Sequence, residues 1–124
     1  MHTPLYTVAH LVLKLTQKLQ KKQHLLNPTQ RMTMRRIHRY VVDLDATFAN
    51  VGDQLSRQQR YQMIDLVTPV QGYVEMLYEG WLGDIHTTLQ ADIVYLRQLV
   101  QQMNDILTGK DQVDKTQHIV GNVG

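Results

Sequence analysis

The chain has 124 residues, contains no cysteine and carries a net charge of +2 at neutral pH. This length is enough to bury the core of one domain, and the lack of cysteine excludes a disulfide framework and a thiolate metal site. No apolar run approaches the ~18 residues of a membrane-spanning helix, and the N-terminal segment lacks the features of a signal peptide, so we expect a cytoplasmic protein with no membrane partner.

The first predicted helix covers residues 4–26. Thr3 is a favourable N-cap, and Pro4 suits the first helical turn. Apolar residues then recur at spacings of three and four, which places one seam on one face of the helix: Leu5, Val8, Val12, Leu15 and Leu19.

The second predicted helix covers residues 28–51 and follows the first almost without a loop. Asn27 is placed as N-cap, Pro28 as first helical residue and Gln30 as the partner of the cap in a capping box. The apolar seam of this helix consists of Met34, Ile37, Val41, Leu44, Phe48 and Val51. So short a connection predicts antiparallel neighbours or a tight corner between the two helices.

The third predicted helix covers residues 57–80, with Ser56 and Gln59 as its capping box. Its apolar seam consists of Met63, Val67, Val70, Val74, Leu77 and Trp81. Pro69 lies inside this helix, where proline costs roughly 3 kcal/mol. Because the seam stays in phase on both sides, we predict one helix kinked at Pro69. The alternative is a break, with Thr68 capping a new helix.

The fourth predicted helix covers residues 85–108 and follows a turn that contains Gly80 and Gly83. Its seam consists of Ile85, Leu89, Ile93, Leu96, Val100, Met103 and Leu107. Gly109 is expected to end the helix, and residues 110–124 show no helical period, which predicts a loose tail.

Four amphipathic helices with one seam each, and no competing strand pattern, predict an all-α antiparallel four-helix bundle. The bundle domain is expected to cover residues 1–109, and the flexible tail residues 110–124. Pairing of two chains through Tyr95 and Leu99 of the fourth helix stays open.

Charge is distributed unevenly along the chain. Residues 1–42 hold eight Lys and Arg and no Asp or Glu, whereas residues 43–124 hold five basic and eleven acidic residues. Such asymmetry indicates an anionic partner for one part of the protein. We therefore predict a basic corner that binds a nucleic-acid backbone or an acidic protein surface, made of Lys14, Lys18, Lys21, Lys22, Arg31, Arg35, Arg36 and Arg39.

Two interpretations of the basic corner compete. In an up-down-up-down bundle the first and third turns lie at the same end, which brings Glu75, Glu79 and Asp84 near the corner. These carboxylates either neutralise the corner internally or leave a surplus of positive charge for an external partner. Because three acids cannot balance eight bases, an external partner is favoured, and backbone contacts of this kind depend strongly on salt.

Other side chains are assigned more briefly. Trp81 and Tyr78 are the predicted contacts to a partner protein, and the alternative for Trp81 is a plug at the end of the bundle. The six histidines show none of the spacings of a metal-binding bundle, so no metal or cofactor is expected. Asp43 and Asp45 lie on different helix faces, which argues against acid–base catalysis and a small-molecule substrate.

The sequence therefore predicts a small, non-enzymatic helical bundle that binds a nucleic-acid backbone, as an accessory subunit of a larger complex. The alternative is a protein-binding adaptor, inhibitor or immunity-type protein of bacterial or phage origin that acts through protein–protein contacts.

Overall fold

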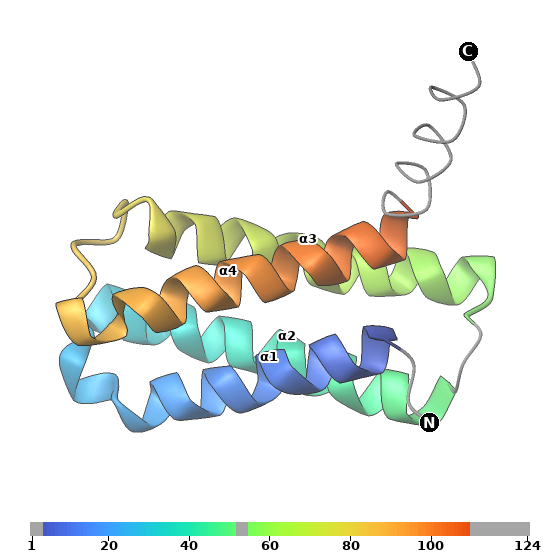
Figure 1. The fold of residues 1–124 in the computed structure, drawn as a ribbon, viewed down its shortest axis with the longest axis horizontal. Helices are drawn as coiled ribbons and strands as arrows, with labels where there is room; N and C mark the ends of the chain where they lie inside the picture. The colour runs from blue at the N-terminus through green and yellow to red at the C-terminus, as the bar shows by residue number, and fades with distance from the viewer. Residues whose placement is uncertain (1–3, 52–54, 110–124) are drawn as a thin grey trace, which may run out of the picture.

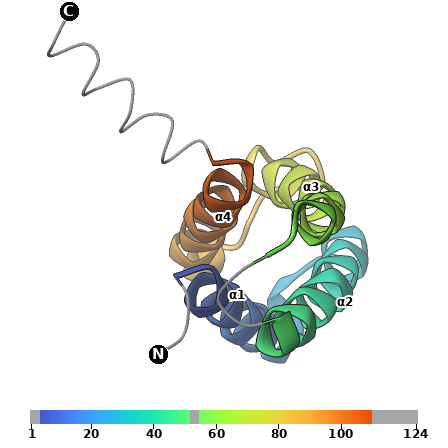
Figure 2. The same ribbon diagram turned by 90° about the vertical axis from the view of Figure 1, so that its right-hand side faces the viewer.

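The computed structural model describes residues 4–51 and 55–109, and these residues form four long helices (Figure 1). The helices are α1 (Pro4–Lys21), α2 (Pro28–Val51), α3 (Arg57–Tyr78) and α4 (Thr87–Thr108), with a short 3₁₀ helix, η1 (Gln23–Leu25), between the first two. Each helix packs against its neighbours in the chain, and α1 also packs against α4, which closes the ring seen end-on in Figure 2. The predicted all-α antiparallel four-helix bundle is confirmed.

The core lies along the axis where the four seams meet. Apart from Ile85, which is half-buried, and Trp81, every predicted seam residue with a described side chain is buried. None of the four helices combines the length and the apolar character that crossing a membrane requires. The predicted cap Thr3 and the predicted tail, residues 110–124, lie outside the described residues.

The first helix ends earlier than predicted, at Lys21 rather than at residue 26. In η1 the chain tightens, with the Leu25 N–H donating to the Lys22 carbonyl at 2.9 Å and the Leu26 N–H to the Gln23 carbonyl at 3.0 Å. Leu26 then adopts an extended conformation and is only 4% exposed. The chain reverses at η1, and the reversal brings Leu26 back into the core.

The turn between α3 and α4 is longer than predicted. Helix α3 ends at Tyr78 instead of residue 80, and α4 begins at Thr87 instead of residue 85. Gly80 and Gly83 lie between the two helices. Their φ angles of +79° and +112° are not helical, so the chain cannot continue as a helix through this turn. The Nδ1 atom of His86 caps α4 by accepting from the Thr88 N–H at 3.1 Å.

Helix α3 runs through Pro69 without interruption, so the alternative of a break at this position is wrong. Val67 and Val70 on either side of the proline are both fully buried, as expected when the seam stays in phase. The predicted capping box at the start of α3 is also present: the Gln59 N–H donates to Ser56 Oγ at 3.1 Å, and the Ser56 N–H donates to Gln59 Oε1 at 2.8 Å.

The capping box of α2 joins the two turns at one end of the bundle. The Gln30 N–H donates to Asn27 Oδ1 at 2.8 Å, and the Asn27 N–H donates to Gln30 Oε1 at 2.9 Å. In addition, Gln30 Nε2 donates to the carbonyl oxygens of Gly83 and Asp84, at 3.1 Å each. Asn27 Nδ2 donates to the Leu82 carbonyl at 2.8 Å. We call these hydrogen bonds the end clamp; they confirm that the first and third turns lie together.

Candidate anion-binding face

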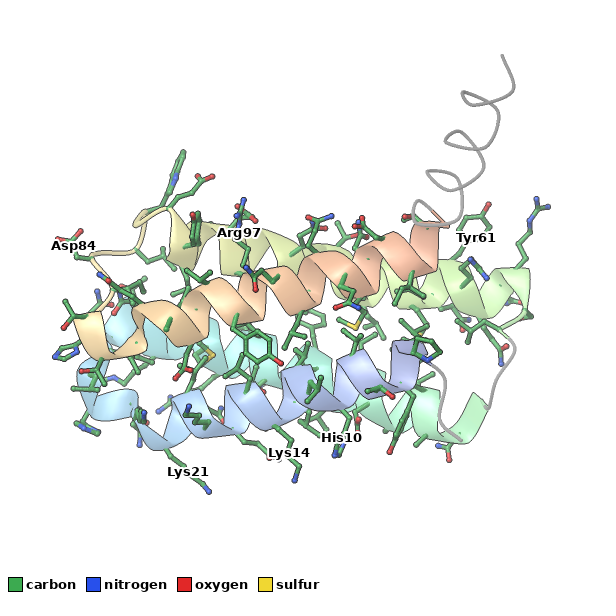
Figure 3. The ribbon with its side chains drawn as sticks, in the orientation of Figure 1. His10, Lys14, Lys21, Tyr61, Asp84 and Arg97 are labelled. Atoms are coloured by element: carbon green, nitrogen blue, oxygen red, sulfur yellow. The ribbon has the colours of Figure 1, made fainter. Side chains whose placement is uncertain are left out.

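Helices α1 and α2 lie side by side and form one outer side of the bundle, opposite α3 and α4 (Figure 2). Lys14 and Lys21, seven positions apart, point outward from α1 and away from α3 and α4 (Figure 3). On α2 the three arginines at positions 31, 35 and 39 recur every four residues and therefore share one side of the helix. The basic face is the set that the fold brings together here: Lys14, Lys21, Arg31, Arg35 and Arg39.

The fold sets the other three residues of the basic corner apart from this face. Lys18 lies at the boundary with α4, where its Nζ is 3.3 Å from Asp92 Oδ1. Arg36 precedes His38 by two residues, which is about 200° around the helix, and His38 faces α1. Arg36 therefore lies on the flank towards α3. Lys22 is half-buried in the turn that leads into η1.

The basic face is not neutralised from within. Of the eight residues in the basic corner, Lys18 alone forms an ion pair within residues 4–51 and 55–109. Arg35 and Arg39 are exposed residues, as are Lys14 and Lys21. An unpaired cluster of like charges on one side is the arrangement expected for an external anionic partner.

Two of the three acids considered for neutralising the corner, Glu75 and Glu79, have other partners. Glu75 Oε1 accepts from Arg97 Nε at 2.7 Å, and this hydrogen bond raises the pKa of the Arg97 guanidinium. Glu79 Oε2 accepts from Trp81 Nε1 at 2.7 Å. The alternative of internal neutralisation is therefore wrong for Glu75 and Glu79, because both side chains find their partners within the α3–α4 half of the bundle. It holds for Lys18, which pairs with Asp92 of α4.

Two polar contacts set the rotation of α1 against α2. His10 Nδ1 and Asp45 Oδ1 are 3.3 Å apart, and the His10 ring stacks on Tyr6 at a centroid distance of 5.9 Å. Closer to the corner, Thr16 Oγ1 and His38 Nδ1 are 3.0 Å apart. The sequence interpretation missed both contacts, and they hold the cationic rows of the two helices on the same side of the molecule.

A groove lies between η1 and α2 within the basic face. It consists of two adjoining hollows of about 240 and 530 Å³, and Arg31 and Arg35 line both. The remaining lining residues are Gln20, Gln23, His24, Leu26, Pro28, Met32 and Met34. The sequence interpretation missed Gln20 and Gln23, since two glutamines in a glutamine-rich helix carry no signal of their own.

Trp81 does not plug the end of the bundle, because its side chain is 75% exposed. Tyr78 is 44% exposed, and the Arg97 guanidinium carbon lies 4.3 Å from the centroid of its ring. Tyr78 lines a third hollow of about 690 Å³, whose lining also includes Glu79 and Asp84, whereas Trp81 lies in the adjoining turn and is not part of the lining. Leu99 is only 5% exposed, so of the two residues considered for chain pairing Tyr95 alone presents a large surface.

Among the described residues, no three His, Asp or Glu side chains converge where they could hold a metal ion. Comparisons with models of protein families, with curated proteins and with solved structures find no significant match to this chain.

Proposed function

We propose that this protein is a non-enzymatic helical bundle that binds a nucleic-acid backbone through its basic face, as an accessory subunit of a larger complex. The observation that carries the proposal is the set of five cationic side chains on the α1–α2 side without a carboxylate partner in the described part of the chain. Nucleic acids present phosphates in a regular array, and Lys and Arg gain affinity for them by releasing condensed counterions. An acidic protein surface is the other anion of suitable charge.

The dimensions of the basic face suit a short stretch of backbone. Eight residues separate Arg31 from Arg39, a helical rise of about 12 Å, and Lys14 and Lys21 are separated by about 10.5 Å along α1. Packed helices lie about 8–10 Å apart, so the face spans about 10 Å in each direction. It can therefore engage about three to five phosphates, by position rather than by base sequence.

The salt dependence of binding tests this proposal. Binding of duplex and single-stranded oligonucleotides, measured at about 50 and about 200 mM salt, should give a log–log slope of about −3 to −4.5 for the duplex and about −2 to −3.5 for the single strand. Arg39→Gln removes one phosphate contact and should reduce the slope by about one. The matched control Arg57→Gln removes an exposed arginine from α3 and should leave the slope unchanged. Lack of binding at the lower salt concentration would rule the proposal out.

A second candidate function is that of a protein-binding adaptor or inhibitor that uses Trp81 and Tyr78. It is supported by the 75% exposure of the Trp81 ring, since large exposed aromatic side chains are typical of protein contacts. A pull-down with Trp81→Ala beside Arg35→Ala plus Arg39→Ala separates the two functions. If the tryptophan variant alone loses its partner, the protein acts through the α3–α4 turn and the basic face is not its contact surface.

A further inference from the structure

The two arginines in the groove between η1 and α2 lack internal partners for their guanidinium groups, whereas two arginines of α3 and α4 have them. Arg97 Nε donates to Glu75, and Arg60 Nη1 donates to the Leu107 carbonyl at 3.1 Å. By contrast, the guanidinium groups of Arg31 and Arg35 have no hydrogen-bonding or ion-pair partner among the residues that the structure describes. Each guanidinium has five N–H donors, and all ten are thus available to a molecule outside the chain.

Arg31 is also half-buried, although no carboxylate lines either hollow of the groove. A guanidinium beside a partly buried surface without a carboxylate has no counter-charge, and an anion in the groove would supply it. The neutral donors beside it are the side-chain amides of Gln20 and Gln23. A groove with two guanidinium groups, two amides and no acid favours a compact anion with several acceptor oxygens.

The spacing of the two arginines fits one such anion. Residues four apart on a helix are neighbours, with Cβ atoms about 5–6 Å apart, so both side chains can close on the same group. The guanidinium fork matches two oxygens of a phosphate at once, which a lysine ammonium does not. On one side Leu26 and Met34, both buried, form the apolar floor, and the end clamp holds the first turn of α2 in place.

We propose that the groove between η1 and α2 is a site for a single phosphate group, held by Arg31 and Arg35 and assisted by Gln20 and Gln23. This inference rests on the proposed function, because it locates one phosphate of the bound nucleic acid at a defined point of the basic face. The phosphate is a terminal monoester or an internal diester. The two share the chemistry of the site, and the experiment distinguishes them.

The test uses variants that keep the charge and remove only the fork. Arg31→Lys plus Arg35→Lys is compared with Arg36→Lys plus Arg57→Lys, a control with the same net charge whose two arginines lie outside the basic face. The probes are a short single-stranded oligonucleotide with a 5′-phosphate, the same oligonucleotide with a 5′-hydroxyl, and inorganic phosphate. Circular dichroism verifies that both variants keep the helical content of the parent chain.

The site variant should bind the oligonucleotide at least about tenfold more weakly than the parent chain at the same salt concentration, and the control less than about twofold more weakly. A preference for the 5′-phosphate that disappears in the site variant assigns a terminal monoester. Equal binding of both oligonucleotides, weakened equally in the site variant, assigns an internal diester. Binding by the site variant within twofold of the parent chain would overturn the phosphate site while leaving the proposed function standing.

A titration with inorganic phosphate, followed by the amide resonances, distinguishes failure of the phosphate site from failure of the proposed function. If the parent chain binds neither oligonucleotide at low salt, the proposed function falls. Phosphate-induced shifts of the amide resonances of residues 20–35, lost in the site variant, would then still support an anion site. If the parent chain binds no oligonucleotide and also shows no phosphate-induced shift, the phosphate site is overturned as well.

Discussion

Gln30→Ala is expected to lower the free energy of unfolding by about 2–4 kcal/mol, because it removes a buried side chain and the donor of two backbone carbonyls. The Gln30 side chain is 1% exposed and donates to the carbonyl oxygens of Gly83 and Asp84. The substitution removes both hydrogen bonds and the acceptor for the Asn27 N–H, and it leaves a cavity. Urea unfolding followed by circular dichroism measures the loss.

Gln30→Glu keeps the shape of the side chain and separates the hydrogen bonds from the packing. The introduced carboxylate would lie against the two carbonyl oxygens, and burial raises its pKa above the value of about 4.3 of an unfolded chain. A folded-state pKa above the unfolded value gives stability that is fully present below about pH 4 and is lost as the pH rises through the folded pKa. The variant should therefore be closer to the parent chain at pH 4 than at pH 7. Equal deficits at the two pH values would contradict this account.

Gly83→Ala should destabilise the protein by about 2–4 kcal/mol through the same end clamp. Gly83 has a φ angle of +112°, and a Cβ atom built on it lies 2.5 Å from Asn27 Nδ2. The alanine therefore strains the backbone and displaces the amide that donates to the Leu82 carbonyl. Thermal and urea unfolding of the variant measure the combined effect.

Gly80→Ala is the matched control for this substitution. Gly80 has a φ angle of +79°, but a Cβ atom there meets nothing within 4 Å. Only the conformational cost of about 1–2 kcal/mol is expected. Adding Asn27→Ala to Gly83→Ala should cost less than the sum of the two single changes, because the steric conflict disappears with the amide. If Gly83→Ala is no worse than Gly80→Ala, the close approach to Asn27 does not matter for stability.

Most of the fold could be predicted because helix formation and core burial both follow local spacing. Apolar residues three and four apart define one face, and that face is buried wherever the residue lies inside a helix. Trp81 shows the limit of this rule: it continues the spacing of the α3 seam, but the helix ends at Tyr78 and the periodicity no longer applies. The end clamp escaped prediction because its acceptors are backbone carbonyls, which every residue type provides.

The candidate site was predictable in charge but not in geometry. The absence of acids from residues 1–42 is visible in the sequence, whereas the pairing of Lys18 with Asp92 depends on which helix lies beside α1. Arg36 could have been set apart earlier, since it is adjacent to Arg35 and so points to a different side of the helix. The groove requires the 3₁₀ turn of η1, which the predicted uninterrupted helix to residue 26 did not include.

The layering of the bundle has an electrical consequence. Residues 4–51, in the α1–α2 layer, carry eight cationic and two anionic side chains, whereas residues 55–109, in the α3–α4 layer, carry three cationic and six anionic side chains (Figure 2). The described part of the molecule thus has a dipole moment across its width rather than along its length. In the field of a polyanion this dipole produces a torque, and the protein turns its α1–α2 side towards the polymer before the two touch.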